Sequence, residues 1–260
     1  MIIKKTAAEI EKMRVAGAAV ARCIQEIIER IEPGKTTTLD IDLMAEELIR
    51  KYGGISSFKN YRGYPNTVCV AVNEEVVHGI PSDRILMPGD ILGIDLGIMV
   101  DGWHGDAAVT IAVGGVASKE AKRLLRVTRE ALYKGIEQAR PGKRLSDIGH
   151  AIQEHVERNG FSIVRDLVGH GIGRSLHEDP HVPNYGKPGC GVRLEEGMTL
   201  AIEPMVNAGD YRVETLDDKW TVVSKDRSLS AHFEHTVAIR RDGPDILTLA
   251  PTGEALSVDA

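Results

Sequence analysis

The sequence predicts an α+β fold in which one unit occurs twice. Pro-Gly-Lys triplets at 33–35 and 141–143 each interrupt a helical pattern, and they are offset by 108 residues. Segments 88–95 and 196–203 align at the same offset. Each copy is therefore predicted to contain two helices followed by a strand. A repeat this long is not a solenoid and indicates a duplicated unit with a pseudo-two-fold axis.

The repeat register places Asp95 over Glu203, so each copy carries a carboxylate in its strand pattern. No Pro/Ser-rich or charged linker divides the chain. We therefore expect one domain over residues 1–260, with pseudo-repeats at roughly 7–115 and 116–250.

In the first copy, apolar residues at helical spacing predict a helix over 7–31, which ends at the first Pro-Gly pair. Thr37 or Thr38 can cap a second helix that stops at the glycine pair 53–54.

In the second copy, Ser118 is expected to begin a helix that is broken at 141–142. Ser146 is expected to begin another helix, which ends at Gly160. The longest segment without a pattern is roughly 204–219.

Two β-rich runs, 91–100 and 103–113, flank an Asp-Gly pair that favours a two-residue hairpin turn. If Val100 pairs with Trp103, Asp95 lies opposite Ala108, and Asp106 lies on the same face one diagonal step away. Diagonal neighbours are about 7 to 8 Å apart, close enough for two carboxylates to share ions. A solvated hairpin face with two unrelated aspartates is the alternative.

Three further residues are candidate metal ligands, although each also has a simpler interpretation. His170 lies among the glycines of 169–173, which would let a ligand approach closely, but a glycine-rich turn can contain a histidine by chance. Glu203 and Glu234 are each a charge within an apolar strand-like run. Either could instead be a glutamate on an edge strand that faces water.

Four carboxylates in one pocket cannot all remain ionised without cations, because two like charges at 4 Å repel by about 4 kcal/mol at an effective dielectric of 20. Two divalent ions would balance them. Oxygen ligands with one imidazole favour Mn, Fe, Co or Zn over Mg. Such a pair can activate a shared water and polarise a carbonyl, which is an apparatus for peptide-bond hydrolysis.

His78 and His177 are candidates to handle protons and the developing oxyanion at such a centre, and His177 lies seven positions beyond His170. Spacing alone does not exclude the competing histidines, which are His104, His181, His232 and His235.

Composition excludes several other classes of protein. The net charge of −6 and the scattered basic residues do not favour direct nucleic-acid binding. The three cysteines, Cys23, Cys69 and Cys190, have no paired spacing, so a reducing compartment is expected. There is no signal-peptide or membrane-span pattern, and we expect a soluble cytoplasmic protein.

Taken together, the motifs resemble those of type I methionine aminopeptidases, which belong to the creatinase-like "pita-bread" superfamily of dinuclear metallohydrolases. The segments that carry the resemblance are 63–65, 73–74, 77–81, 94–95, 101–106, 169–173, 177–178, 202–205 and 233–236. The resemblance covers nearly the whole chain. It implies a single catalytic domain with a central curved antiparallel sheet and outer helices.

The resemblance also implies a role for each candidate. Asp95 would chelate one metal, Asp106 and Glu234 would bridge two, and His170 and Glu203 would hold the other. Glu203 would also shuttle a proton, while His78 and His177 would contact the substrate. The implied methionine pocket comprises Phe58, Tyr61, Tyr64, Cys69, Leu176 and Trp220.

The implied substrates are peptides or nascent chains in which methionine is followed by a small residue, and ribosome association and a monomeric state are further expectations. Relatives often have cysteine at the position of Phe58 and an aromatic residue at that of Leu176. Two alternatives share the fold: an X-Pro peptidase, and a binding protein that has lost the chemistry. Type II relatives have a helical insertion between His170 and Glu203, where this chain has only 32 residues.

Overall fold

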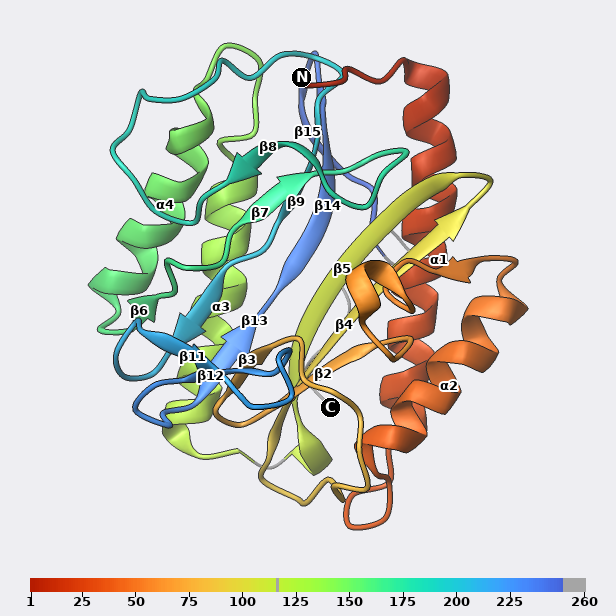
Figure 1. Cartoon of the computed structure of the whole chain (residues 1–260). Coiled ribbons are helices and arrows are strands. Elements are labelled where there is room, and N and C mark those ends of the chain that lie inside the picture. Colours follow the sequence, from red (N-terminus) through yellow and green to blue (C-terminus); the bar gives the residue numbers. More distant parts are fainter. Residues whose placement is uncertain (116, 250–260) are drawn as a thin grey trace.

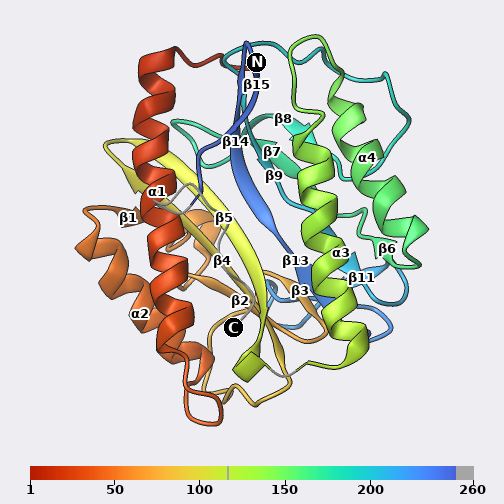
Figure 2. The ribbon, with the colours of Figure 1, turned by 180° about the vertical axis from the view of Figure 1, so that it is seen from behind.

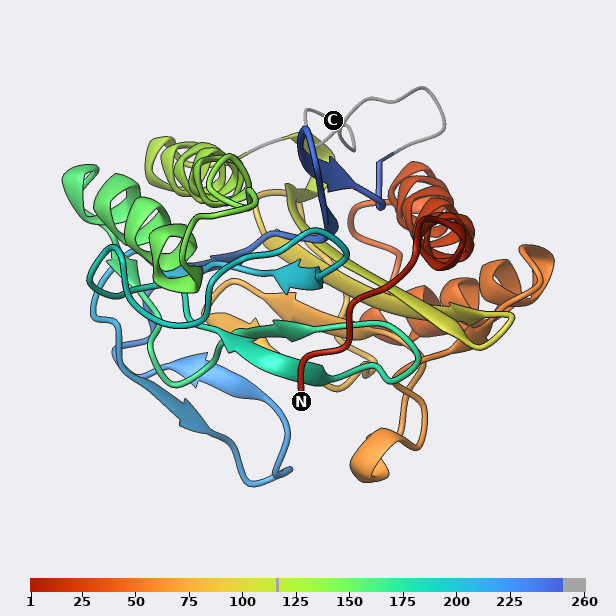
Figure 3. The same cartoon turned by 90° about the horizontal axis from the view of Figure 1, so that it is seen from above.

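Four long helices cover one face of a curved antiparallel sheet (Figures 1 and 3). The computed structural model describes residues 1–115 and 117–249. Seen from above, the sheet curls away from the helices, and the short elements η1 and β11–β12 lie on its opposite side (Figure 3). This arrangement confirms the α+β class and the curved sheet with outer helices.

The first two helices begin and end where the sequence predicts. Helix α1 (Ala7–Arg30) begins with a capping box formed by Thr6 and Glu9. Helix α2 (Thr38–Lys51) is capped by Thr37, and Gly53 takes the left-handed conformation, with a φ of 73°, that ends it.

Helix α3 (Lys119–Ile136) is capped by Ser118 as predicted. Helix α4 (Leu145–Arg158) begins earlier than expected, and the prediction that Ser146 caps it is wrong. The carboxylate of Asp147 accepts the backbone N–H of Arg144 at 2.8 Å, so the cap lies at Arg144. The Ser146 hydroxyl instead bonds to the backbone of Cys190.

The central sheet has the strand order β1-β4-β5-β14-β9-β7-β8, with β2 paired to β4 and β15 paired to β14. Its strands are β1 (Ile55–Ser56), β2 (Cys69–Val72), β4 (Ile91–Val100), β5 (Trp103–Ala112), β7 (Gly169–Gly171), β8 (Glu178–Val182), β9 (Thr199–Ile202), β14 (Glu234–Arg240) and β15 (Gly243–Ile246).

Two small sheets and two 3-10 turns complete the fold of the described residues. The small sheets contain β6 (Ser162–Ile163), β10 (Met205–Asn207) and β13 (Ser230–His232), and β3 (Glu75–Val77), β11 (Val213–Thr215) and β12 (Val222–Ser224). The turns are η1 (Tyr61–Gly63) and η2 (Val113–Gly115). Strands β10 and β11 fall within 204–219, the longest segment in which the sequence shows no pattern.

The two halves place helices and strands in a similar order. Helix α1 lies beside β4 and β5 and α2 lies beside α1 and β1, while α3 and α4 lie beside strands of the second half (Figure 2). Strands β10 to β13 lie between Glu203 and Glu234. The division at 7–115 and 116–250 remains a prediction, and residues 116 and 250 lie outside the described residues.

Apolar residues from both helix pairs and the sheet form one large buried core. Within 1–115 and 117–249, no helix combines the length and apolar character needed to cross a membrane. All three cysteines are free thiols, and only Cys190 is exposed.

Candidate metal centre and substrate cavity

The pairing register places a row of four residues across four strands on one face of the sheet. Cys69 of β2 lies opposite Asp95 of β4, Asp95 lies opposite Ala108 of β5, and Ala108 lies opposite Glu234 of β14. Directly opposed residues in an antiparallel pair share a face. The predicted pairing of Asp95 with Ala108 is confirmed, and the small Ala108 side chain leaves room between the two carboxylates.

Asp106 lies on the same face as this row, because it is two positions from Ala108 and opposite Gly97. Its backbone is fixed by Thr236, whose hydroxyl accepts the Asp106 N–H at 3.0 Å and donates to its carbonyl at 2.8 Å. These two hydrogen bonds extend the contact between β5 and β14 past the residue pairs that their strands form.

Glu203 and His170 reach the same face from the other half of the sheet. His170 of β7 pairs with Ala201 of β9, which is two positions before Glu203. The nearest oxygen of Glu203 lies 3.5 Å from Nε2 of His170. The five candidate ligands thus come from β4, β5, β7, β14 and the residue after β9.

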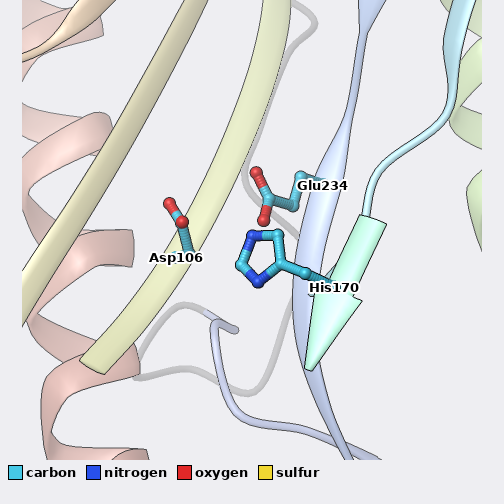
Figure 4. A group of neighbouring side chains, drawn as sticks. All are labelled: Asp106, His170 and Glu234. Atoms are coloured by element: carbon cyan, nitrogen blue, oxygen red, sulfur yellow. The ribbon is translucent and has the colours of Figure 1, made fainter. Parts of the chain in front are cut away.

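Three of the five form a compact group, whose side chains are drawn in Figure 4. Asp106, His170 and Glu234 are buried, and each offers a ligand atom within 4.8 Å of the other two. Within the described residues, one buried oxygen each of Asp95, Asp106 and Glu234 has no hydrogen-bond partner. Buried polar atoms are normally paired, so these oxygens are suited to a cation.

The metal-free carboxylates strongly disfavour ionisation. Burial raises the pKa of Asp95 to about 7. Burial, followed by repulsion from neighbouring carboxylates, raises the pKa of Asp106, Glu203 and Glu234 well above the ordinary range. A divalent cation would reverse these shifts by stabilising the ionised forms.

His170 is arranged as a neutral ligand. Burial lowers its pKa to about 4. Its Nδ1 lies 2.8 Å from the Gly171 carbonyl oxygen, so Nδ1 carries the proton and donates, which leaves the Nε2 lone pair directed toward the carboxylates. One nitrogen and four carboxylates fit divalent ions such as Mn, Fe, Co or Zn.

A cavity of about 140 Å³ opens beside this cluster. All thirteen residues that the sequence singled out line it: Phe58, Tyr61, Tyr64, Cys69, His78, Asp95, Asp106, His170, Leu176, His177, Glu203, Trp220 and Glu234. Arg62 also lines it, and sequence reasoning missed this residue. Its position between the aromatic residues Tyr61 and Tyr64 was the available signal.

One end of the cavity is apolar and largely buried. Gly97 is needed there, because a Cβ at this position would lie 2.7 Å from the Phe58 ring. The Trp220 ring meets the Tyr64 ring edge-on, with centroids 5.2 Å apart. Cys69 stands in the row beside Asp95, so the apolar end adjoins the carboxylates directly.

His177 lies between the carboxylates and the cavity mouth. The β7–β8 turn brings its ring to 4.0 Å from that of His170, and the Tyr61 ring stacks on it at 5.2 Å with an interplanar angle of 9°. Burial, followed by the proximity of His170 and Arg62, lowers the pKa of His177 to about 3, so the imidazole is neutral at neutral pH. Burial also lowers the pKa of His78.

Comparison with known proteins shows the family to which this chain belongs. Residues 11–241, most of the chain, match the family model described as metallopeptidase family M24. The chain belongs to metallopeptidase family M24. It is therefore a metal-dependent hydrolase of peptide bonds.

Several M24 relatives are similar over their whole length. The methionine aminopeptidase of Clostridium perfringens is 54% identical over 96% of this chain and 99% of its own. Methionine aminopeptidase 1 of Bacillus subtilis is 54% identical over 95% and 99%. A crystal structure of methionine aminopeptidase from Thermotoga maritima superposes with a TM-score of 0.93 at 51% identity, covering 95% of this chain and 99% of that one.

The prolidase of Pyrococcus horikoshii is more distant. It superposes with a TM-score of 0.79 at 24% identity and covers 99% of this chain but 66% of its own. This similarity concerns the fold alone. It agrees with the pita-bread fold expected from the sequence.

The competing histidines of this M24 peptidase lie outside the cavity lining. His104 contacts the Ser57 hydroxyl at 2.8 Å, and His235 contacts Thr248 at 2.9 Å. His232 lies nearest the centre, with Nε2 3.9 Å from a Glu203 oxygen, and burial lowers its pKa to about 3. Its role is therefore that of a neutral neighbour of Glu203.

A buried ion pair anchors the turn that carries His177 in this M24 peptidase. Lys5 donates to the carboxylate of Glu178 and to the carbonyl of Ile3, and both charged side chains are almost fully buried. We expect Lys5→Met to lower the free energy of unfolding by roughly 3 to 5 kcal/mol, because it leaves the Glu178 charge buried without a cation beside it. The double variant Lys5→Met/Glu178→Leu should recover much of this loss in urea unfolding. Equal losses in the single and double variants would contradict this account.

Ala108 provides the space between Asp95 and Glu234, so a larger residue should interfere with metal binding. We expect Ala108→Val to weaken metal affinity at least roughly tenfold, equivalent to about 1.4 kcal/mol, in a chelator competition assay. Ala107→Val is the matched control, because Ala107 is buried on the opposite face of the same strand. The control should change the melting temperature rather than the metal affinity. Equal affinities in both variants would contradict the proposed position of the ions.

Proposed function

We propose that this protein removes N-terminal methionine from polypeptides whose second residue is small. The observation that carries the proposal is the 54% identity, over nearly the full length, to methionine aminopeptidases. The cavity supports it, because an apolar pocket of side-chain size adjoins a cluster of metal ligands. An X-Pro peptidase is not favoured, since the prolidase similarity is limited to the fold.

The five ligands would hold two divalent ions. Asp95 would bind one, His170 and Glu203 the other, and Asp106 and Glu234 both. Bound ions supply Lewis acidity toward the scissile carbonyl and lower the pKa of a water to around 7. Without metal these carboxyl groups have raised pKa values, as expected for buried groups whose charges are balanced by shared cations.

His177, His78 and Glu203 would handle the substrate and its protons. The neutral His177 ring can donate a hydrogen bond to the scissile amide, and the stacked Tyr61 holds its plane. His78 lies beside the substrate path with a left-handed backbone, at a φ of 59°. Glu203 would accept a proton from the attacking water and pass it to the departing amine.

The buried apolar end would bind the methionine side chain. Phe58, Tyr64, Cys69 and Leu176 are all less than a tenth exposed, and Trp220 closes the pocket against Tyr64. A flexible thioether is favoured in such an aromatic-lined site. Phe58 packs against Gly97, where a side chain would collide with its ring. Leu176 is smaller than the aromatic residue that relatives often have, and the two residues together shape the pocket.

The setting of the reaction is also part of this proposal. We expect a monomeric cytoplasmic enzyme that acts on nascent or finished chains, with ribosome association as the route to nascent ones. Two ions per chain, drawn from Co, Mn, Fe and Zn, would be needed. No nucleic-acid or membrane contact is required.

A peptide assay tests the function. Protein loaded with each metal in turn is incubated with Met-Ala-Ser and with an X-Pro peptide, and released amino acids are identified by mass spectrometry. We expect free methionine from Met-Ala-Ser and no cleavage before proline. Cleavage of the X-Pro peptide without methionine release would overturn the proposal. Inactivity with every metal would favour a binding protein.

A further inference from the structure

An arginine lies at the mouth of the cavity. Arg62 is exposed and lines the cavity. Within residues 1–115 and 117–249, its guanidinium makes no hydrogen bond or ion pair, whereas Arg14, Arg84 and Arg212 each contact a carboxylate. Its donors are therefore available to a ligand that enters the cavity.

The backbone around this arginine adopts an unusual conformation. Asn60, Arg62 and Gly63 all have positive φ values, of 69°, 50° and 90°. Non-glycine residues seldom adopt this conformation, and such strain is often found at functional sites. The guanidinium carbon lies 5.4 Å from the centre of the Tyr61 ring, which is a cation–π arrangement.

A stack of rings connects Arg62 to the metal ligands. Tyr61 stacks on His177, and His177 lies against His170. The guanidinium carbon lies 5.4 Å from the centre of the Tyr61 ring, and that centre lies 5.2 Å from the centre of the His177 ring. The distance from the guanidinium to the His177 ring is therefore at most the length of about three extended residues. A group on the third or fourth residue of a substrate held beside His177 is within reach of Arg62.

The direction of the substrate follows from burial. The methionine side chain would enter the buried end of the cavity, so the rest of the chain must leave through the exposed end. Arg62 is the cation in the lining at this end. A guanidinium with unused donors matches the planar geometry of a carboxylate.

We infer that Arg62 binds a carboxylate on the third or fourth residue of the substrate and makes the peptidase favour N-terminal methionine chains with an acidic residue there. This inference rests on the proposed methionine aminopeptidase function. The carboxylate can come from an Asp or Glu side chain or, in a short peptide, from the free C-terminus. Exposed charge pairs contribute modestly, so we expect a roughly two- to five-fold effect on kcat/KM.

The test compares C-terminally amidated peptides that differ in one group. Met-Ala-Glu-Ser-amide and Met-Ala-Ser-Glu-amide are each compared with the matching Gln peptide, and Met-Ala-Ser is compared with its amide. The wild-type protein should prefer the Glu peptides and the free carboxylate by roughly two- to five-fold at low salt. The preference should disappear at 1 M salt, where the Debye length falls to about 3 Å.

Three variants at one position make the result specific. Arg62→Gln should abolish the Glu-over-Gln ratio, Arg62→Lys should retain part of it, and Arg62→Glu should reverse it. Arg22→Gln is the matched control, because Arg22 also lies over a tyrosine ring, that of Tyr52 at 5.6 Å, outside the cavity lining. The control should keep the wild-type ratio.

The possible outcomes separate the inference from the function on which it rests. An unchanged Glu-over-Gln ratio in Arg62→Gln would overturn the inference while methionine release continued. A preference for the free C-terminus alone would restrict the site to short peptides and would overturn the claim for acidic side chains. If Arg62→Gln does not fold, as judged by thermal melting, the reversed ratio in Arg62→Glu decides. Failure of the wild-type protein to release methionine from any peptide would overturn the proposed function instead.

Discussion

Asp106→Asn or Glu234→Gln is expected to abolish methionine release while leaving the protein folded. Both side chains lie in the tightest part of the ligand cluster, together with His170. An amide of the same shape loses the charge that would hold both ions. Loss of a residue that only supports a ligand costs roughly 10- to 100-fold, so loss of a shared ligand should cost more than about 100-fold in kcat. Steady-state assays with saturating metal measure this loss.

The fold should survive these changes because burial, followed by mutual repulsion, makes ionisation of these carboxyl groups unfavourable in the metal-free protein. An amide does not ionise, so each substitution removes part of this cost. We therefore expect the metal-free variants to melt at or above the temperature of the metal-free wild type. Asp147→Asn is the control, since it weakens the cap of α4 and should lower stability by about 1 kcal/mol without changing kcat. Full activity in both cluster variants would show that neither residue binds the ions.

Chelation of the metal should abolish activity and make stability depend on pH. The pKa values of the four carboxyl groups are raised in the folded, metal-free protein, and that of Asp95 is raised to about 7. The folded state therefore binds more protons than the unfolded state above about pH 4. Stability is lost as the pH rises through the folded pKa values.

The buried histidines act in the opposite direction below about pH 6.5. The pKa values of His170 and His235 are lowered to about 4, so unfolding binds protons there and stability rises with pH. Above about pH 7 these histidines are neutral in both states. We therefore expect the melting temperature of chelated protein to fall between about pH 7 and 8.5, and that of metal-loaded protein to change less. Parallel curves with and without metal would contradict the proposed cluster.

Local patterns predicted a large part of the fold. The capping residues Thr37 and Ser118 and the register of the 91–113 hairpin follow from neighbouring residues, and the structure confirms them. The cap of α4 was missed because Ser146 has a distant competitor, the backbone of Cys190. No local pattern reports such a contact.

The assembly of the site depends on pairing between distant strands. Strand β14 lies between β5 and β9, and this position brings Glu234 level with Ala108 and beside Asp106. The repeat register aligned Asp95 with Glu203, but the sequence does not specify which strands become neighbours. Arg62 was missed because its position between Tyr61 and Tyr64 does not by itself show that it lines a cavity enclosed by distant segments.

Anomalous diffraction from crystals grown with Mn²⁺ tests the central claim most directly. We predict two peaks about 3.5 to 4 Å apart. Both peaks should contact Asp106 and Glu234, with Asp95 on one ion, and with His170 and Glu203 on the other. A single peak that contacts neither Asp106 nor Glu234, or the absence of any peak at this cluster in protein that releases methionine, would contradict the account.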